Sequence, residues 1–91
     1  MDVGTLVSLK VSCLGNSVGS IGVVYENYNR GASVIFKNGA YDGFSEEEQK
    51  MFLEEIGFCE EVSDYNFVSV VRLSEDFRKG FFDPVFKRAL S

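Results

Sequence analysis

The chain is organised around residues 20–57, which read SIGVVYENYNRGASVIFKNGAYDGFSEEEQKMFLEEIG. Within this stretch, apolar residues predict strands over 20–28 and 32–37, separated by a polar turn. Asn38-Gly39 lies between apolar runs and favours a two-residue type I′ hairpin turn, because both positions tolerate positive φ. Such a turn places Phe36 opposite Tyr41 and sets the register of the fourth strand.

A helix is predicted directly after this hairpin. Ser45 is a typical N-cap residue, and Glu48 completes a capping box because its side chain can reach back to the cap N–H. Three consecutive glutamates in the first turn complement the helix dipole, and Gly57 predicts the end of the helix. Phe52 and Ile56 lie four residues apart, which predicts the buried face of the helix.

Further strands are predicted on both sides of this stretch. Residues 5–11 alternate like a half-buried strand and lead into a glycine-rich loop over 12–19. The loop lacks the Lys-Ser/Thr end of a P-loop and the spacing of a dinucleotide-binding fingerprint, so no cofactor or small-molecule ligand is predicted. Residues 64–73, DYNFVSVVRL, are apolar on both faces and predict a central fifth strand.

Residues 74–91 predict a helical tail. Ser74 marks the start of one helical turn that stops at Gly80, and Asp83 before Pro84 caps a second. The tail contains four phenylalanines: Phe77, Phe81, Phe82 and Phe86. Either the tail folds back to complete the core, or part of it contacts a protein partner or a second copy of the chain in a homodimer.

Together these elements predict one domain, residues 1–91, of the mainly β or α+β class. At 91 residues the chain is near the lower end of what folds alone, and its 45% apolar content suits one core. Residues 3–73 are expected to form a five-stranded, strongly bent sheet or a small barrel, with a helix between strands four and five. An open α+β sheet with helices on one face is the alternative.

The net charge of −5 is unevenly distributed along the chain. Residues 41–67 hold nine acidic residues and one lysine, whereas residues 1–40 and 68–91 are weakly positive. The acidity therefore lies on the predicted helix and the loop after it, where Glu47 and Glu54 point to water. This acidic face is either solvated surface or a docking surface for a protein.

The residue types argue against an enzyme. The chain has no histidine, the commonest general base and a common metal ligand. Cys13 and Cys59 have no CxxC spacing and no sequence neighbour that would activate a thiolate. Glu60, Glu61 and Asp64 match no calcium-binding loop, so no metal site is predicted.

The sequence also indicates a compartment. Two isolated thiols, rather than a disulfide, are the preferred interpretation of the cysteines and suit a reducing environment. The N-terminal residues lack the basic region and apolar run of a signal peptide, and no segment approaches the ~18 apolar residues of a membrane span. We expect a cytoplasmic protein with no membrane contact.

Several short motifs carry a family resemblance: Val3-Gly4-Thr5-Leu6-Val7, Gly19-Ser20-Ile21-Gly22-Val23-Val24, Val34-Ile35-Phe36 and Asn38-Gly39. They resemble SH3-like small barrels, including the KOW type, over about half of the chain. The resemblance implies a recognition module for peptides, protein partners or nucleic acid. The chain departs from the simplest members by the full helix between strands four and five.

These features predict a small non-enzymatic binding module or accessory factor. Protein contacts or self-association come first, through the four phenylalanines of the tail or through Glu47 and Glu54. An acidic inhibitor of a basic enzyme, of the immunity-protein type, is one form of this function.

A nucleic-acid-associated KOW-like domain is the alternative. The acidic composition opposes it, because phosphate neutralisation dominates nucleic-acid affinity. The candidate face consists of Lys10, Tyr25, Arg30, Lys37 and Tyr41, with Tyr28 beside them.

Overall fold

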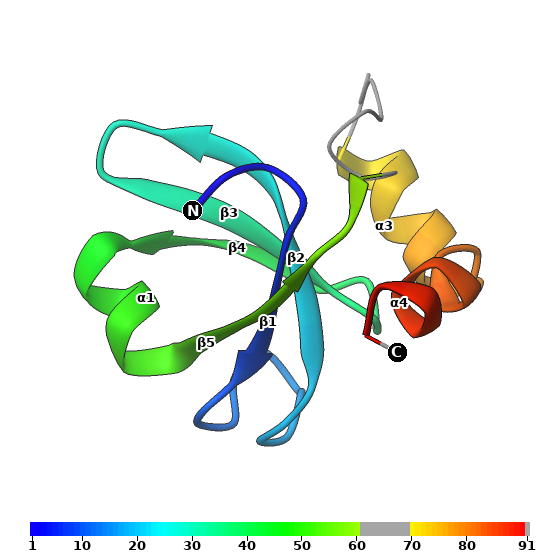
Figure 1. Cartoon of the computed structure of the whole chain (residues 1–91), viewed down its shortest axis with the longest axis horizontal. Coiled ribbons are helices and arrows are strands. Elements are labelled where there is room, and N and C mark those ends of the chain that lie inside the picture. Colours follow the sequence, from blue (N-terminus) through cyan, green and yellow to red (C-terminus); the bar gives the residue numbers. More distant parts are fainter. Residues whose placement is uncertain (61–69, 91) are drawn as a thin grey trace.

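A computed structural model describes residues 1–60 and 70–90 of the chain. Five strands form one antiparallel sheet in the order β4-β3-β2-β1-β5 (Figure 1). The strands are β1 (Thr5–Leu9), β2 (Ile21–Tyr28), β3 (Gly31–Phe36), β4 (Tyr41–Ser45) and β5 (Leu53–Phe58). The described helices are α1 (Glu46–Phe52), which joins β4 to β5, and then α3 (Val70–Arg78) and α4 (Asp83–Leu90).

The predicted α+β class is confirmed, and the sheet stays open rather than closing into a barrel. Strands β4 and β5 are its two edges, and both contact α1, which connects them. The expected helix after the fourth strand is therefore present, and so is a short helix at the C-terminal end.

The central strands are buried on both faces, which explains why apolar residues follow one another directly in their sequences. Successive side chains of a strand point to opposite faces of a sheet. In β2, Val23 therefore belongs to one buried cluster and Val24 to another. The first cluster comprises Leu6, Val23, Ile35, Cys59, Leu73, Phe77, Phe82 and Phe86. The second comprises Val7, Leu9, Val24, Ala32, Val34, Phe36, Phe44 and Leu53.

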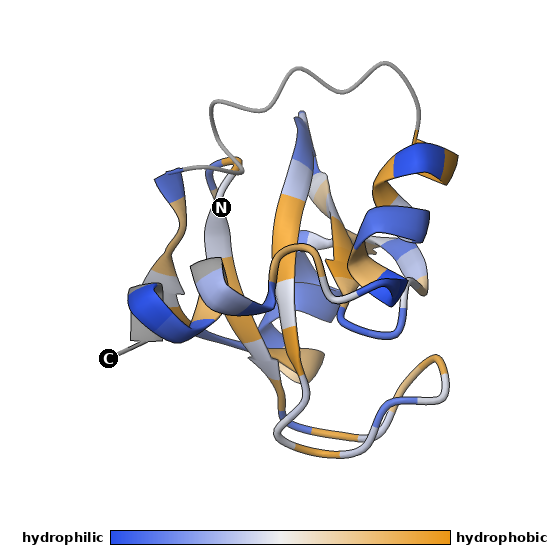
Figure 2. Cartoon of the chain, turned by 90° about the vertical axis from the view of Figure 1, so that its right-hand side faces the viewer, coloured by the Kyte–Doolittle hydropathy of each residue, from blue (hydrophilic) through white to orange (hydrophobic). Residues whose placement is uncertain are grey.

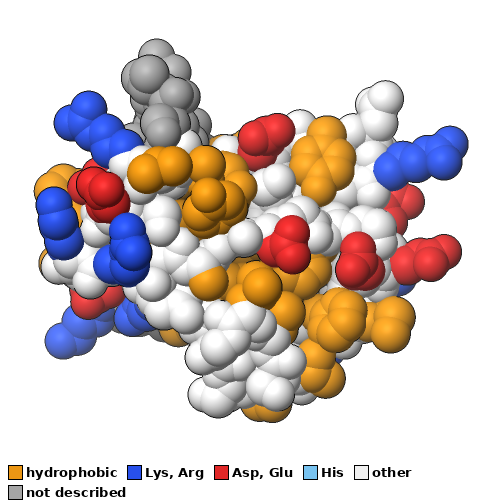
Figure 3. All heavy atoms as spheres, turned by 180° about the vertical axis from the view of Figure 1, so that it is seen from behind, with side chains coloured by type: hydrophobic (Ala, Val, Ile, Leu, Met, Phe, Trp, Pro, Cys, Tyr) orange, Lys and Arg blue, Asp and Glu red, His pale blue; other side chains and the backbone are white. Residues whose placement is uncertain are grey.

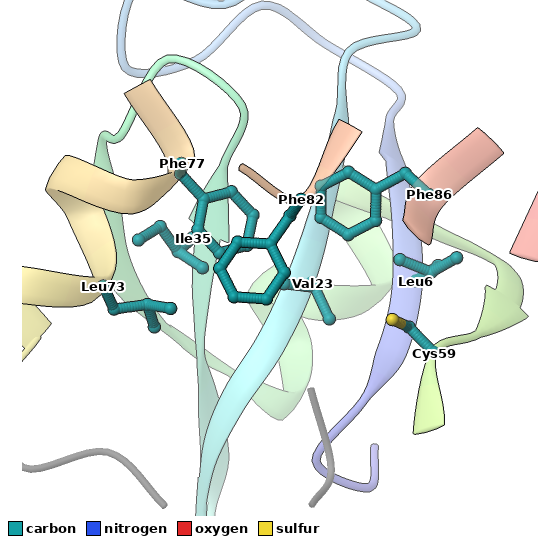
Figure 4. Packing of buried hydrophobic residues seen from close by; sticks show 8 residues of the cluster. All are labelled: Leu6, Val23, Ile35, Cys59, Leu73, Phe77, Phe82 and Phe86. Carbon is teal, nitrogen blue, oxygen red and sulfur yellow. The ribbon is translucent and has the colours of Figure 1, made fainter. Parts of the chain in front are cut away.

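The helical tail completes the first cluster. The Phe77 ring stacks on Phe82 with centroids 4.6 Å apart and lies 5.4 Å from the Phe86 ring. All three rings are buried and face the strand residues of the cluster (Figure 4). In Figure 2 the ribbons of α3 and α4 alternate between hydrophilic and hydrophobic residues, as expected for helices with one buried face. Of the two alternatives for the tail, folding back onto the core is the one observed for these rings.

The predicted start of α1 is confirmed. The Ser45 hydroxyl accepts a hydrogen bond from the Glu48 backbone N–H (3.1 Å), and the Glu48 carboxylate accepts one from the Ser45 N–H (3.0 Å). This reciprocal pair is the capping box expected from the Ser-Glu-Glu-Glu run.

The predicted end of this helix is wrong. Helix α1 stops at Phe52 rather than near Gly57, and Leu53 is already extended with φ −120° and ψ 140°. Lys10 at the end of β1 stabilises this early stop, because its backbone N–H donates to the Phe52 carbonyl (2.8 Å) and its ammonium to the Lys50 carbonyl (2.9 Å). Residues 53–58 then pair with β1, so Ile56 lies on an edge strand and is 37% exposed instead of buried.

The fifth strand predicted at 64–73 is also misplaced. Residues 70–73 are the first turn of α3, and residues 64–69 lie outside the described residues. Ser74 is therefore not the start of a helix. It lies buried within α3, where its hydroxyl donates to the Gly39 carbonyl at 2.5 Å. The helical spacing of Leu73 and Phe77, both buried, was the signal that favoured a helix here.

The predicted register of the β3–β4 hairpin is one residue off. Tyr41 pairs with Ile35 rather than with Phe36. The Phe36 N–H donates to the Ala40 carbonyl and the Gly39 N–H to the Phe36 carbonyl, so the loop has three residues and only Gly39 has a positive φ, at 88°. A slip of one residue moves side chains to the other face, and Phe44 consequently joins the second cluster.

Contacts from outside the hairpin explain this turn. The Asn38 side-chain oxygen accepts from the Ala40 N–H (3.0 Å) and from the Asn16 amide of the β1–β2 loop (3.2 Å), while the Gly39 carbonyl is held by α3. The two-residue loop with two positive φ values occurs instead within 12–19, at Leu14 (52°) and Gly15 (77°).

Phe77→Ala should lower the free energy of unfolding by about 3–5 kcal/mol, because a buried ring in contact with two other rings is lost. Phe81→Ala should lower it by less than about 1 kcal/mol, because Phe81 is 67% exposed. Urea denaturation followed by circular dichroism measures both values. Similar losses for the two variants would contradict the burial of the tail.

Candidate functional site

Three tyrosines form an exposed aromatic surface on the sheet, called here the tyrosine surface: Tyr25, Tyr28 and Tyr41. Tyr41 pairs with Ile35 across β3–β4 and so points to the face of the first cluster. Tyr28 and Tyr41 are 46% and 42% exposed, whereas Tyr25 is half-buried against that cluster. The surface thus adjoins the part of the sheet that α3 and α4 cover.

Two glycines leave the space in which the Tyr28 side chain lies close to the sheet. A Cβ atom at Gly31 would lie 2.9 Å from Tyr28 Cε2, and one at Gly43 would collide with the Tyr28 hydroxyl. Gly43 and Tyr41 are two residues apart on β4, so their Cβ directions lie on the same face. Tyr28 therefore spans β3 and β4 beside Tyr41. Its position depends on the absence of side chains at Gly31 and Gly43.

Tyr25 and Tyr41 are held by a contact with each other. Their ring centroids are 6.5 Å apart at an interplanar angle of 90°, the edge-to-face arrangement that aromatic pairs favour. Tyr25 sits where the β2–β3 register shifts between Val24 and Glu26, so this irregularity sets its direction.

One carboxylate, that of Glu26, influences the ionisation of the tyrosine surface. Partial burial raises the pKa of the Tyr25 hydroxyl above its ordinary value of 10.0, while a hydrogen bond with the Ser33 side chain acts in the opposite direction. Glu26, Tyr41 and Tyr28 raise the same pKa further. The phenol therefore stays neutral at physiological pH, and the carboxylate beside it favours a cationic ligand group.

The structure does not bring together the basic residues of the predicted nucleic-acid face. Arg30 directly precedes β3 and Lys37 directly follows it, so the six residues of the strand, which span roughly 20 Å, separate them. Lys37 lies 3.8 Å from the Asp83 carboxylate and 5.9 Å from the centre of the Phe86 ring. Lys10 is held at the C-terminal end of α1. Within this candidate set, the rings of Tyr25 and Tyr41 are in contact.

The predicted protein-binding residues separate into buried and exposed groups. Phe77, Phe82 and Phe86 are in the core and are not available to a partner without unfolding. Phe81 is exposed at the turn between α3 and α4. Glu47 and Glu54 are exposed on α1 and β5.

The glycines under Tyr28 were not identified from the sequence. A signal was present, because glycine is disfavoured in strands and often marks a close approach of another group. The sequence does not show which group approaches, since Tyr28 reaches Gly43 across an intervening strand.

The remaining features of the described residues define no reaction. A depression of about 520 Å³ between the N-terminus, α1 and β5 has a lining of both charge signs: Met1, Lys10, Glu46, Gln49, Lys50, Leu53, Glu54 and Glu55. Within 1–60 and 70–90, no three His, Cys, Asp or Glu residues are grouped to hold a metal ion. Cys59 is buried in the first cluster and Cys13 packs against the second, so the sheet separates the two thiols.

Comparison with known proteins assigns no family to the chain. Protein-family models, curated proteins and solved structures give no match to the chain. None of the helices in the described parts of the chain has the length and apolar content to cross a membrane.

Gly43→Ala should displace the Tyr28 ring and lower the free energy of unfolding by less than about 1 kcal/mol, because the group in the way is the end of a side chain that can move. Gly31→Ala should cost about 1–3 kcal/mol, because its Cβ meets the Phe44 carbonyl as well as Tyr28. Thermal unfolding and the NMR shifts of the Tyr28 ring measure these effects. An unchanged Tyr28 ring in Gly43→Ala would contradict the described contact.

Tyr25 should make stability depend on pH in the alkaline range. Its pKa is raised in the folded chain, so the folded state retains this proton when the unfolded state loses it. The free energy of unfolding should therefore fall as the pH rises above about 10, and it should fall less steeply in Tyr25→Phe. Urea denaturation at several pH values between about 9 and 11 measures the slope, and equal slopes for the two proteins would refute the assignment.

Proposed function

We propose that the protein is a small, non-enzymatic binding module of the cytoplasm that contacts a protein partner through the tyrosine surface. The observation that carries this proposal is the fixed placement of three half-exposed tyrosines on one sheet face. Tyr28 lies over Gly31 and Gly43, while Tyr25 and Tyr41 hold each other edge to face.

Tyrosine suits protein recognition for physical reasons. Its ring buries a large area, its hydroxyl can form a hydrogen bond, and only two side-chain torsions must be fixed on binding. Tyrosine is accordingly enriched among the residues that dominate interface energetics. Rings that already contact the sheet and each other lose less freedom on binding, which favours affinity.

The chemistry of the surface favours a basic peptide segment. Arg and Lys side chains are attracted to the faces of aromatic rings, and a neighbouring carboxylate such as Glu26 strengthens that attraction. The net charge of −5 also favours encounter with a basic partner. The same charge disfavours a polyanion, so the nucleic-acid alternative gains no support from this surface.

A random-peptide display library selected against the purified protein tests the proposal. We expect Arg- or Lys-containing peptides to be enriched. Their affinity should fall at least about tenfold in the double variant Tyr28→Ala, Tyr41→Ala, because loss of two interface tyrosines costs on the order of 1.4 kcal/mol or more. Isothermal titration calorimetry with one selected peptide measures this change.

Val18→Ala is the matched control, because Val18 is 64% exposed on the β1–β2 loop. The proposal fails if selected peptides bind the double variant as tightly as the control, or if no peptide is enriched. Retention of single-stranded RNA near physiological salt, lost on Arg30→Glu and Lys37→Glu, would favour the nucleic-acid alternative instead.

A further inference from the structure

Two exposed apolar side chains lie in oppositely charged parts of the chain. Phe81 and Met51 are the most exposed large apolar residues among those described, at 67% and 65%. Met51 is one helical turn beyond Glu47 on α1, so the two share a face of the helix, and Glu54 follows on β5. Protein interfaces typically combine an apolar centre with a polar rim, and each of these two residues places one apolar side chain among charged ones.

The other exposed residue, Phe81, belongs to the basic end of the molecule. Phe81 lies in the turn between α3 and α4, shortly after Arg78, the last residue of α3, and Lys79. Lys87 lies in the last turn of α4. These three basic side chains are all exposed. The described tail, residues 70–90, has five basic and three acidic residues, whereas residues 41–60 have seven acidic residues and one lysine.

The two charged surfaces lie at opposite ends of the molecule. Figure 1 shows α1 at one end and α3 with α4 at the other. In Figure 3 most visible Lys and Arg side chains lie at the end formed by α3 and α4, although a basic side chain also projects at the other end, where most visible Asp and Glu side chains lie. We call Glu47, Met51 and Glu54 the acidic surface, with Lys10 and Lys50 lining the depression beside Glu54, and Lys79, Phe81 and Lys87 the basic surface.

We infer that the acidic surface of one copy docks on the basic surface of a second copy, head to tail. Within one molecule the two surfaces cannot meet, because the sheet lies between them. Between two molecules, their charges are complementary, and the Met51 thioether can pack against the Phe81 ring, a contact that sulfur and aromatic groups favour. The contact joins two different surfaces, so each copy keeps one of each and the assembly extends to chains or rings.

This inference does not depend on the tyrosine surface. Tyr25, Tyr28 and Tyr41 belong to neither docking surface. Peptide binding by that surface and head-to-tail assembly can therefore fail or succeed separately.

Sedimentation velocity over a range of protein concentrations tests the assembly. We expect species larger than the monomer at low salt, with a dissociation constant that rises at least about tenfold between ~0.01 M and ~0.15 M salt, because the Debye length falls from ~30 Å to ~8 Å. A protein that stays monomeric at low salt, or that associates equally at both salt concentrations, would overturn the inference.

Charge reversal identifies the surfaces. The variants Glu47→Lys, Glu54→Lys and, separately, Lys79→Glu, Lys87→Glu should each lose self-association at low salt. An equimolar mixture of the two should associate again, because each then carries ends that complement the other. Circular dichroism confirms that each variant is folded, and failure of the folded mixture to associate would contradict head-to-tail docking.

Matched controls separate these effects from general changes in charge or surface polarity. Asp2→Lys alters an exposed acid outside both surfaces and should leave association unchanged. Met51→Ser should weaken association, whereas Val18→Ser, at a residue that is 64% exposed on the β1–β2 loop, should not. Equal effects of the two serine variants would refute the apolar contact.

Discussion

The fold depends on the contact between the phenylalanine rings of the tail and one face of the sheet. The central strands present apolar side chains on both faces, with Val23 on one and Val24 on the other. A sheet of this kind is stable in water only when both faces are covered. Phe52 of α1 packs against the cluster of the second face, and Phe77, Phe82 and Phe86 cover the first.

The same contact determines which side chains of this sheet face stay exposed. Helices α3 and α4 cover the part of the face that holds Val23 and Ile35, and the tyrosines of β2 and β4 lie beside it, half-exposed. Burial of the tail rings removes them from any interface and leaves Phe81 at the surface. The buried rings of the tail thus complete the core. The tyrosine surface and the charged surfaces stay exposed, at separate places on the molecule.

Local chemistry explains which parts of the fold could be predicted from the sequence. The capping box of Ser45 and Glu48 is formed by residues three apart, and it occurs as predicted. The end of α1 depends instead on Lys10, forty positions away, and on pairing of residues 53–58 with β1. The site divides in the same way. The sequence shows that the three tyrosines are present. It does not show that Tyr28 lies over Gly43, because that contact forms only when β2, β3 and β4 lie side by side.

A nuclear Overhauser spectrum of the aromatic protons tests the arrangement most directly. It should show contacts from the Phe77, Phe82 and Phe86 rings to methyl groups of Val23 and Ile35. It should also show a contact from the Tyr28 ring to the Gly43 α-protons. Contacts from the tail rings to Val24 or Val34, on the opposite face, would contradict the packing, as would a Tyr28 ring without contact to Gly43.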